Sequence, residues 1–546
     1  MWQPVDDQPL DLITRLTEQR GDEPGIAVAV LRGGAVVARR YVGLARLEDR
    51  IPIGPDTRFH IVSVSKTFTA AAVLLLAARG ALGLDEDIRR YLPDLPPTSG
   101  VTIRQLLSMT SGLRDVLEIA RLRGIWTASP SRTRELLDLA WRQRTVSAPP
   151  GAQYMYANVN FLLLDALISQ VSGMPADAFR RATLYEPLGL TATTERRHDG
   201  VVIPDLADPY VPDARGGWSR ATYLLGIAAD PVVTTLGDLT RWLLTLRSGT
   251  IRGVGVTAAM AERTRVRDGT EVYYGLGLAV RRYRGLTVLC HTGTQPGWKA
   301  HIAYVPARDL GVVILSNRDD TQPPVVTASI LSALIGDDFP RPHPGEDRTQ
   351  CSSLTGTQLA AVPGSYLDPD AGDWVALTVD DGILRGETLG DPLVLYDEGP
   401  GVFRDGDDYR ATVPAHLRIE FGSSPDEVSC RLNLGGQHLV LGKCRPPRYA
   451  ATALDAFTGR YENQDIGSEH VVRVQDGQVW IDYGRAGAGG FRFPMDPIAP
   501  DAFLVRPRAP GVAYRHLFRF ERDSAETVVS TVVTMERLKG MRLWRT

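Results

Sequence analysis

The sequence has few cysteines, few lysines and no long apolar run. Its 546 residues include 4 cysteines, none in a C-x-x-C pair, which excludes a disulfide-rich scaffold. No stretch approaches the roughly 20 apolar residues that a bilayer span requires. A formal net charge of −3 gives no overall basic field for nucleic acid or for an anionic membrane. We therefore expect neither partner.

Composition and the first residues favour a multidomain cytoplasmic protein. Hydrophobic residues make up 43% of the chain and charged residues 23%, which suffices to bury substantial cores. At about 150 residues per domain, the length predicts three or four domains. The opening stretch, MWQPVDDQPLDLITRL, lacks the basic segment, apolar run and small-residue cleavage site of a secretory signal. We expect a cytoplasmic location.

Because lysine is scarce, each lysine is informative. The 61 basic residues include four lysines: Lys66, Lys299, Lys443 and Lys539. Lys66 follows Ser63 by three residues, a spacing that places both side chains on one helix face. Burial and a helix N-terminus both disfavour the lysine cation, and a neutral lysine can take the proton of a serine nucleophile. The alternative is a chance pairing, since composition alone would produce about 0.2 such pairs.

The predicted secondary structure changes at about residue 340. Before it, apolar spacing predicts a hairpin over 25–43, a helix over 63–79 and strands between Gly275 and Asn317. Strands at both ends, with helices between them, predict one sheet built from distant segments. The polar, proline-rich stretch 337–350 suits a linker. After it, short alternating strands separated by glycine turns predict antiparallel β structure.

The β-rich part contains a repeat. LAAVPGSY, which ends at Tyr366, resembles LDAFTGRY, which ends at Tyr461, and the Asp-Gly turn at Gly382 matches one at Gly477. Both pairs are 95 residues apart. We predict a first domain over 1–340 and two tandem antiparallel β domains, over about 350–450 and 451–546.

Two further segments carry polar side chains suited to catalysis. In YMYAN (Tyr154–Asn158), a phenol near a neutral lysine can share the role of general base, and the Asn158 amide can hold the lysine and a substrate carbonyl. In His291-Thr292-Gly293, the glycine allows a close approach and the histidine can relay a proton near pH 7. Taken singly, core tyrosines and a hydrogen-bonded strand histidine are the commoner outcomes.

No pattern indicates a metal or an organic cofactor. His291 and His301 are ten residues apart and have no partner at ligand spacing. The glycine cluster over 484–490 follows a predicted strand but opens no helix, so it suits a loop rather than a nucleotide-binding turn.

In their order along the chain, S-x-x-K, Y-x-N and H-T-G resemble the motifs of the penicillin-recognising serine hydrolases. VTIRQLLSMTSGL, EPLGL and YGLGL resemble the class C β-lactamase-like branch, and the resemblance covers roughly residues 5–335. It implies an α+β fold with helices packed on an antiparallel sheet. It also implies that Ser63 is the acylated nucleophile, that Lys66 and Tyr156 transfer protons, and that Asn158 contacts the substrate amide.

The third motif narrows the resemblance. β-Lactamases usually carry a lysine where this chain has His291, and the D-stereospecific aminopeptidases of the family carry histidine. The resemblance implies that Gly293, in the same motif as His291, borders the substrate. It also implies that the backbone N–H groups of Ser63 and Thr294 form the oxyanion hole. Those aminopeptidases also have two C-terminal antiparallel β-barrels, which matches the layout of the whole chain. The resemblance further implies that the protein is a homodimer.

In those aminopeptidases, a loop from the last domain binds the free α-amine of the substrate through an aspartate. The segment that resembles this loop is Gly487–Pro497, with Phe491 at the aspartate position and Asp482 and Asp496 out of register. The specificity-loop residues are therefore Gly487, Gly489, Gly490, Phe491, Arg492 and Phe493.

Together these observations predict a metal-independent serine hydrolase that releases small N-terminal D-residues, such as D-Ala, or Gly, from peptides, amides or esters. One alternative is an esterase, or a β-lactamase or D,D-peptidase-like hydrolase, with the same Ser-Lys-Tyr residues. An alternative of another class is a non-catalytic peptide-binding protein.

Overall fold

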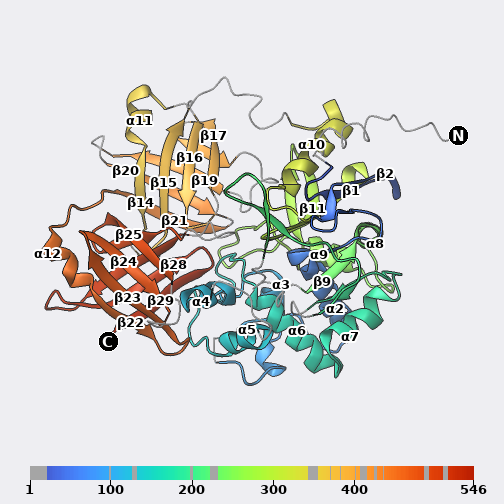
Figure 1. Ribbon diagram of the computed structural model, residues 1–546, viewed down its shortest axis with the longest axis horizontal. Helices are drawn as coiled ribbons and strands as arrows, with labels where there is room; N and C mark the ends of the chain where they lie inside the picture. The colour runs from blue at the N-terminus through green and yellow to red at the C-terminus, as the bar shows by residue number, and fades with distance from the viewer. Residues whose placement is uncertain are drawn as a thin grey trace.

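Figure 1 shows the computed structural model, with a mixed domain on one side and two barrels stacked on the other. The structure describes residues 21–96, 100–125, 132–196, 201–221, 231–341, 354–368, 370–380, 383–390, 392–399, 401–405, 415–422, 427–434, 436–484, 491–507 and 515–546.

The mixed domain is built on a six-stranded antiparallel sheet of order β10-β11-β12-β13-β1-β2. The strands are β1 (Ile26–Arg32), β2 (Ala35–Val42), β10 (Ala279–Tyr283), β11 (Leu286–Gln295), β12 (Trp298–Val305) and β13 (Leu310–Ser316). β1 pairs with β13, Ile26 opposite Ser316, so distant segments form one sheet as predicted. The β1–β2 turn runs through Gly33 and Gly34, both at positive φ, the conformation that a tight hairpin turn requires.

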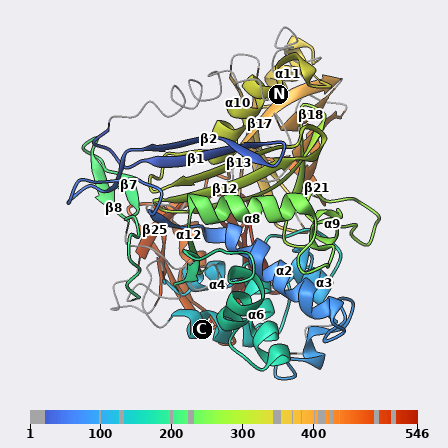
Figure 2. The same cartoon turned by 90° about the vertical axis from the view of Figure 1, so that its right-hand side faces the viewer.

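Helices cover this sheet and form a second layer. They are α2 (Ser65–Ala78), α3 (Ile103–Leu107), α4 (Val116–Leu122), α5 (Arg132–Trp141), α6 (Val159–Ser172), α7 (Ala176–Arg180), α8 (Leu236–Ser248), α9 (Val256–Ala261) and α10 (Pro323–Ile335). α8 lies along one face of the sheet in Figure 2 and contacts β1, β12 and β13. α2 packs against α6 and is buried around most of its circumference, which explains its continuous apolar run.

Shorter strands form three small separate sheets: β3 (Leu44–Arg46) with β4 (Ile51–Pro52), β5 (Arg58–His60) with β9 (Val232–Thr235) and β6 (Thr194–Glu195), and β7 (Tyr210–Pro212) with β8 (Trp218–Arg220). In the described part of the chain, no single helix has the length and apolar character to cross a membrane. The pair formed by α6 and the 176–185 segment passes that test by length and composition, with a bend of 76°.

Two closed eight-stranded barrels follow. The first contains β14 (Gly364–Leu367), β15 (Trp374–Asp380), β16 (Ile383–Thr388), β17 (Leu393–Gly399), β18 (Val402–Asp405), β19 (Ala415–Phe421), β20 (Val428–Leu434) and β21 (Gln437–Cys444), preceded by α11 (Gly356–Ala361). The second contains β22 (Gly459–Asn463), β23 (Ser468–Gln475), β24 (Gln478–Tyr483), β25 (Phe491–Ala499), β26 (Ala502–Val505), β27 (His516–Arg522), β28 (Val528–Met535) and β29 (Leu538–Arg545), preceded by α12 (Ala451–Leu454). The predicted fold class is confirmed.

The repeat in the sequence has a structural counterpart at the start of each barrel. The Tyr366 hydroxyl donates a hydrogen bond to the carbonyl oxygen of Val362 at 2.6 Å, and the Tyr461 hydroxyl donates to that of Phe457 at 2.8 Å. Each buried phenol therefore anchors the first strand to the helical turn four residues before it.

Candidate active site

Ser63 lies in a short turn between a strand and the central helix. The turn, η1 (Val62–Val64), follows β5, and α2 begins at Ser65, so Ser63 precedes the α-helix rather than opening it as predicted. Val62 has φ of +48°, a conformation that is costly for a β-branched residue. The backbone is thus strained immediately before the serine.

The lysine of the S-x-x-K motif is fully buried and contacts the serine. Lys66 is 1% exposed, and its Nζ lies 3.0 Å from Ser63 Oγ. The same Nζ donates to Asn158 Oδ1, also at 3.0 Å. Ser63, Lys66 and Asn158 are therefore brought together as the motifs predict, within reach of proton transfer.

Asn158 is oriented by a carboxylate that the sequence analysis missed. Asp115 Oδ2 accepts hydrogen bonds from the Asn158 side-chain Nδ2 at 2.8 Å and backbone N–H at 2.9 Å. Its Oδ1 accepts from the Leu117 N–H, so Asp115 also caps the N-terminus of α4. The Asn158 amide is thereby held with its oxygen toward Lys66.

Tyr156 lies beside this group and is flanked by two basic side chains. Its ring centroid is 5.3 Å from Lys66 Nζ and 5.1 Å from the guanidinium carbon of Arg537, a residue of the second barrel. Tyr156 is only partly buried, so its ring borders both the catalytic lysine and the surface.

His291 lies in β11 and is neutral. Burial, reinforced by the nearby Lys66 charge, lowers its pKa to about 3. Nδ1 lies 3.0 Å from the carbonyl oxygen of Thr292, and Nε2 lies 2.8 Å from the Tyr274 hydroxyl. Since a carbonyl only accepts, we assign the proton to Nδ1, and Nε2 then accepts from Tyr274. The third motif therefore supplies no positive charge.

Gly293 is required where β11 approaches the serine turn. A Cβ at this position would lie 2.2 Å from the carbonyl oxygen of Ile61 and 3.1 Å from the backbone nitrogen of Ser63. Thr294, the next residue, is exposed at the end of β11 and pairs with Lys299. The predicted oxyanion hole from Ser63 and Thr294 stays a prediction.

Together these residues place a serine, a buried lysine, a tyrosine and a neutral histidine between a helix and a sheet edge. The Beta-lactamase family profile matches residues 13–337. The chain belongs to the beta-lactamase family. The match spans the mixed domain and all of the catalytic motifs, and the two barrels follow it.

Two relatives extend the likeness beyond this domain, and a solved structure matches over a share of the chain similar to that of the domain. A D-aminopeptidase of Cereibacter sphaeroides is 26% identical, with 92% of this chain and 91% of the relative covered. A D-aminopeptidase of Brucella canis is 27% identical, with 99% of each chain covered. The structure of a D-amino acid amidase from Ochrobactrum anthropi SV3, with L-phenylalanine amide, matches at 23% identity and TM-score 0.52, covering 61% of this chain and 98% of that one.

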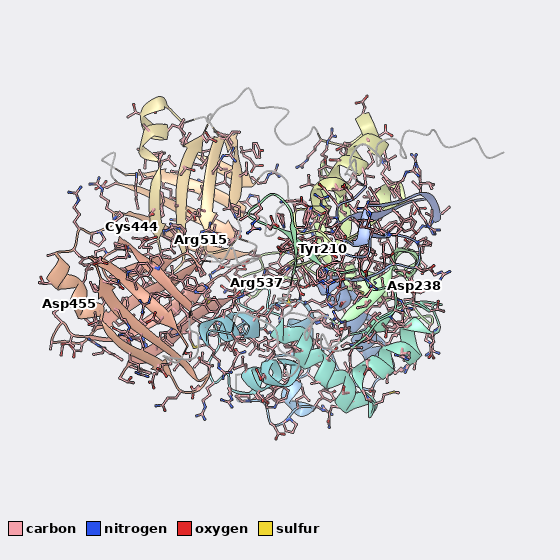
Figure 3. The ribbon with its side chains drawn as sticks, in the orientation of Figure 1. Tyr210, Asp238, Cys444, Asp455, Arg515 and Arg537 are labelled. Atoms are coloured by element: carbon pink, nitrogen blue, oxygen red, sulfur yellow. The ribbon has the colours of Figure 1, made fainter. Side chains whose placement is uncertain are left out.

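The beta-lactamase domain of this chain receives a hairpin from the second barrel. The tip between β28 and β29 carries Glu536 and Arg537, and the Arg537 carbonyl oxygen accepts a hydrogen bond from the Asp115 N–H at 2.9 Å. Figure 3 shows Arg537 where the second barrel meets the beta-lactamase domain. The hairpin therefore continues the chain of contacts that runs from Asp115 through Asn158 to Lys66.

The predicted specificity loop lies at another edge of the same barrel. Gly487, Gly489 and Gly490 lie outside the described residues. Phe491, Arg492 and Phe493 begin β25, where Phe491 stacks on Phe493 and Arg492 pairs with Asp482 at 2.6 Å. The strand end beside them packs Gly484 against Gly124, after the C-terminus of α4, whereas Asp115 is at its N-terminus. An active-site role for this loop stays a prediction.

The sequence analysis missed Asp115, Tyr274 and Arg537. Tyr274 opens the quoted YGLGL stretch, and Asp115 lies two residues after the quoted VTIRQLLSMTSGL stretch, but neither pattern gave a reason to select these residues. Within the described residues, no group of three or more His, Cys, Asp or Glu side chains is placed to bind a metal ion.

Proposed function

We propose that this protein is a serine hydrolase that releases N-terminal D-amino acids from peptides, amides or esters through an acyl-enzyme. The observation that carries the proposal is the contact of buried Lys66 with Ser63, in a chain that aligns over nearly its whole length with D-aminopeptidases. The alignment with D-aminopeptidases includes both barrels. This favours a D-aminopeptidase over a single-domain β-lactamase.

In the proposed acylation step, Ser63 Oγ attacks the substrate carbonyl carbon while its proton passes to Lys66 or Tyr156. A buried lysine favours the neutral form that such a transfer needs. Asn158 is held by Asp115 and positions both Lys66 and the substrate amide. The leaving amine takes a proton from the same Lys66 and Tyr156 pair.

In the proposed deacylation step, water attacks the acyl-enzyme and the same groups accept and return its proton. His291 acts as a neutral hydrogen-bonding group, because its pKa of about 3 precludes a cation at neutral pH. It holds the Tyr274 hydroxyl, whose ring packs edge-on to Tyr156 at 6.4 Å between centroids. His291 thus orients the tyrosine wall of the site.

Initial rates on D-Ala-, L-Ala- and N-acetyl-D-Ala-p-nitroanilide test the proposal. Selective turnover of the D-form with a free amine supports it, and equal turnover of the acetylated compound contradicts it. Ser63→Ala should abolish hydrolysis of activated esters, with Ser65→Ala as a neighbouring serine control. Undiminished ester hydrolysis by Ser63→Ala would show that the nucleophile is misassigned.

One observation favours an esterase with the same catalytic residues. Phe491 is 37% exposed and apolar at the position where the resembling aminopeptidases carry an aspartate. Turnover of p-nitrophenyl esters without turnover of any of the three anilides would favour this second candidate. The cytoplasmic location and the homodimer stay predictions, testable by cell fractionation and by light scattering.

A further inference from the structure

A groove on the outer face of the first barrel is lined by arginine and histidine side chains. Its volume is about 270 Å³, and it is formed by β18, β19, β20 and β21. The strand register places Arg418 of β19 directly opposite Arg431 of β20, with Val440 of β21 next in the same row. The leucines that alternate with these residues belong to the barrel core, so the row faces away from the core.

The positive charge in this groove is only partly balanced. Arg431 pairs with Glu420 at 2.9 Å, whereas the exposed Arg418 side chain makes no ion pair or hydrogen bond with any described residue. The residues that line the groove include no aspartate or glutamate. Like charges directly opposite each other destabilise a sheet, so an anion bound between the two arginines would remove a repulsion.

The groove also carries apolar surface and further hydrogen-bond donors. Val440 is 55% exposed beside Arg431. In the next row, Asn433 accepts from the Gly436 N–H through Oδ1, which leaves its amide nitrogen as a donor. The planar fork of an arginine matches a carboxylate with two parallel hydrogen bonds. An organic carboxylate with an apolar neighbour therefore fits this surface better than an inorganic anion, which gains nothing from contact with a valine.

The groove lies where the first barrel meets the beta-lactamase domain. His438, at one end of the second row, has Nε2 3.3 Å from Thr270 Oγ1 and 3.6 Å from the Asp268 carboxylate, both in that domain. The segment that follows leads to Tyr274, which contacts His291. A peptide bound in the groove would thus be held beside the domain that carries the proposed catalytic residues.

We propose that this groove is a second binding site, which takes the C-terminal carboxylate and the apolar last side chain of a peptide. Arg418 and Arg431 bind the carboxylate, and Val440 contacts the side chain. The site lies apart from the proposed catalytic residues, so it retains peptides on the protein without taking part in bond cleavage. The inference goes beyond the proposed function and does not require that function to be correct.

Calorimetric titration of the full-length protein with acetyl-Gly-Leu and acetyl-Gly-Leu-amide tests the inference. The two ligands differ in the charge of the terminal group, and neither has the free amine of the proposed substrates. We expect the acid to bind about tenfold more tightly than the amide, the lower end of the range for hydrogen bonds to charged groups, because the arginines are exposed. Acetyl-Gly-Asn should bind less tightly than acetyl-Gly-Leu, because its polar side chain gains less from contact with Val440.

Three variants locate the binding. Arg418→Ala should remove the preference for the acid and leave hydrolysis of activated esters unchanged. Val440→Glu should also remove it, by placing a carboxylate of the protein beside Arg431. The matched control is Arg385→Ala, which removes an exposed arginine of the same barrel outside the groove and should keep the full preference.

The inference is overturned if the acid and the amide bind equally, if neither binds, or if the preference survives Arg418→Ala. Inorganic phosphate serves as a competitor. If it binds as tightly as acetyl-Gly-Leu and displaces it, the groove is a general anion site and the peptide assignment is wrong. Failure of the proposed function looks different: no anilide is cleaved, while the Arg418-dependent binding of the acid persists and supports this inference.

Discussion

In the first barrel, the last hairpin turns at Gly436 and rests against the beta-lactamase domain. A Cβ added to Gly436 would lie only 2.7 Å from Val272 Cγ1 of that domain. In the second barrel, the last hairpin turns at Glu536 and Arg537, and Arg537 reaches Tyr156 and Asp115. Both barrels therefore contact the same domain through equivalent hairpins. The first makes a close steric contact, and the second delivers a charged side chain to the catalytic residues.

The two barrels also differ in how their cores join the rest of the molecule. The core of the first barrel, around Tyr366 and Leu417, is a separate cluster of buried residues. That of the second, around Tyr461 and Phe518, is continuous with the core of the beta-lactamase domain. The first barrel can thus act as a structural support while the second, built on the same repeat, reaches the candidate active site. Such a difference is possible because the residues of a hairpin turn can change without altering the barrel core.

Asp115→Ala should produce the largest effect, because Asp115 joins the second-barrel hairpin to Asn158. Its removal leaves two buried N–H groups of Asn158 without their acceptor, and we expect kcat/KM to fall by about 10²- to 10³-fold. The matched control is Asp268→Ala, which removes an exposed carboxylate beside His438 of the first barrel. Both variants are measured on the same anilide substrate. An equal loss of kcat/KM in the two would contradict the view that only the second barrel contacts the candidate active site.

Lys539→Met should cost about 3 kcal/mol of unfolding free energy, because it strands a buried carboxylate. Asp373 would keep its contact with Gln437 but lose both 2.6 Å contacts with the ammonium group that joins the barrels. The double variant Lys539→Met/Asp373→Leu should recover much of the loss. Urea unfolding checks both, and a double variant less stable than the single one would contradict this account.

Acid should destabilise the second barrel more than the first. Burial lowers the pKa of His470 and of His516 to about 3, and the Arg121 charge adds to the effect at His516. The unfolded chain binds these protons near pH 6.5, so this stability is present above pH 6.5 and is lost as the pH falls toward 3. Two such groups together remove roughly 3 kcal/mol of unfolding free energy per pH unit over that range.

In the first barrel, by contrast, His416 and His438 are exposed. Hydrogen exchange followed by mass spectrometry at pH 7 and 5.5, corrected for intrinsic rates, resolves the two barrels. His470→Phe should reduce the acid sensitivity of the second barrel. Equal loss of protection in both barrels would argue against the buried histidines as its cause.

Gly436→Ala should have the smallest effect, about 1 kcal/mol or slightly more of lost stability, with kcat/KM unchanged. The residue has φ of +93° and no space for a Cβ beside Val272. Gly442→Ala is the control, since nothing lies within 4 Å of its Cβ position. Thermal unfolding and anilide turnover test both variants, and a large activity loss in Gly436→Ala would give the first barrel a catalytic role.

Local spacing predicted the elements and part of the site. Ser63 and Lys66 are three residues apart, and they meet even though Ser63 lies in a 3₁₀ turn, because side chains at this spacing also align there. Tyr366 and Tyr461 revealed the duplicated barrel because each anchors its first strand by the same local hydrogen bond.

Residues that make contacts between domains showed no recognisable spacing pattern in the sequence. In the sequence, Asp115 looks like an ordinary N-cap of a helix. Its second role, accepting hydrogen bonds from Asn158, exists only in the folded protein, where the two distant segments meet. Arg537 is one of many arginines, and its approach to Tyr156 depends on how the whole second barrel docks.

By itself, the sequence determined the Ser63–Lys66 pair, the antiparallel sheet and the duplicated β domains, since these depend on spacing between near neighbours and on alternation of apolar residues. The tertiary structure alone decided that His291 is neutral and that Arg537 is the cation beside Tyr156. The charge of a histidine follows from its burial and the position of an arginine from domain docking, and both are set by contacts between segments far apart in the chain.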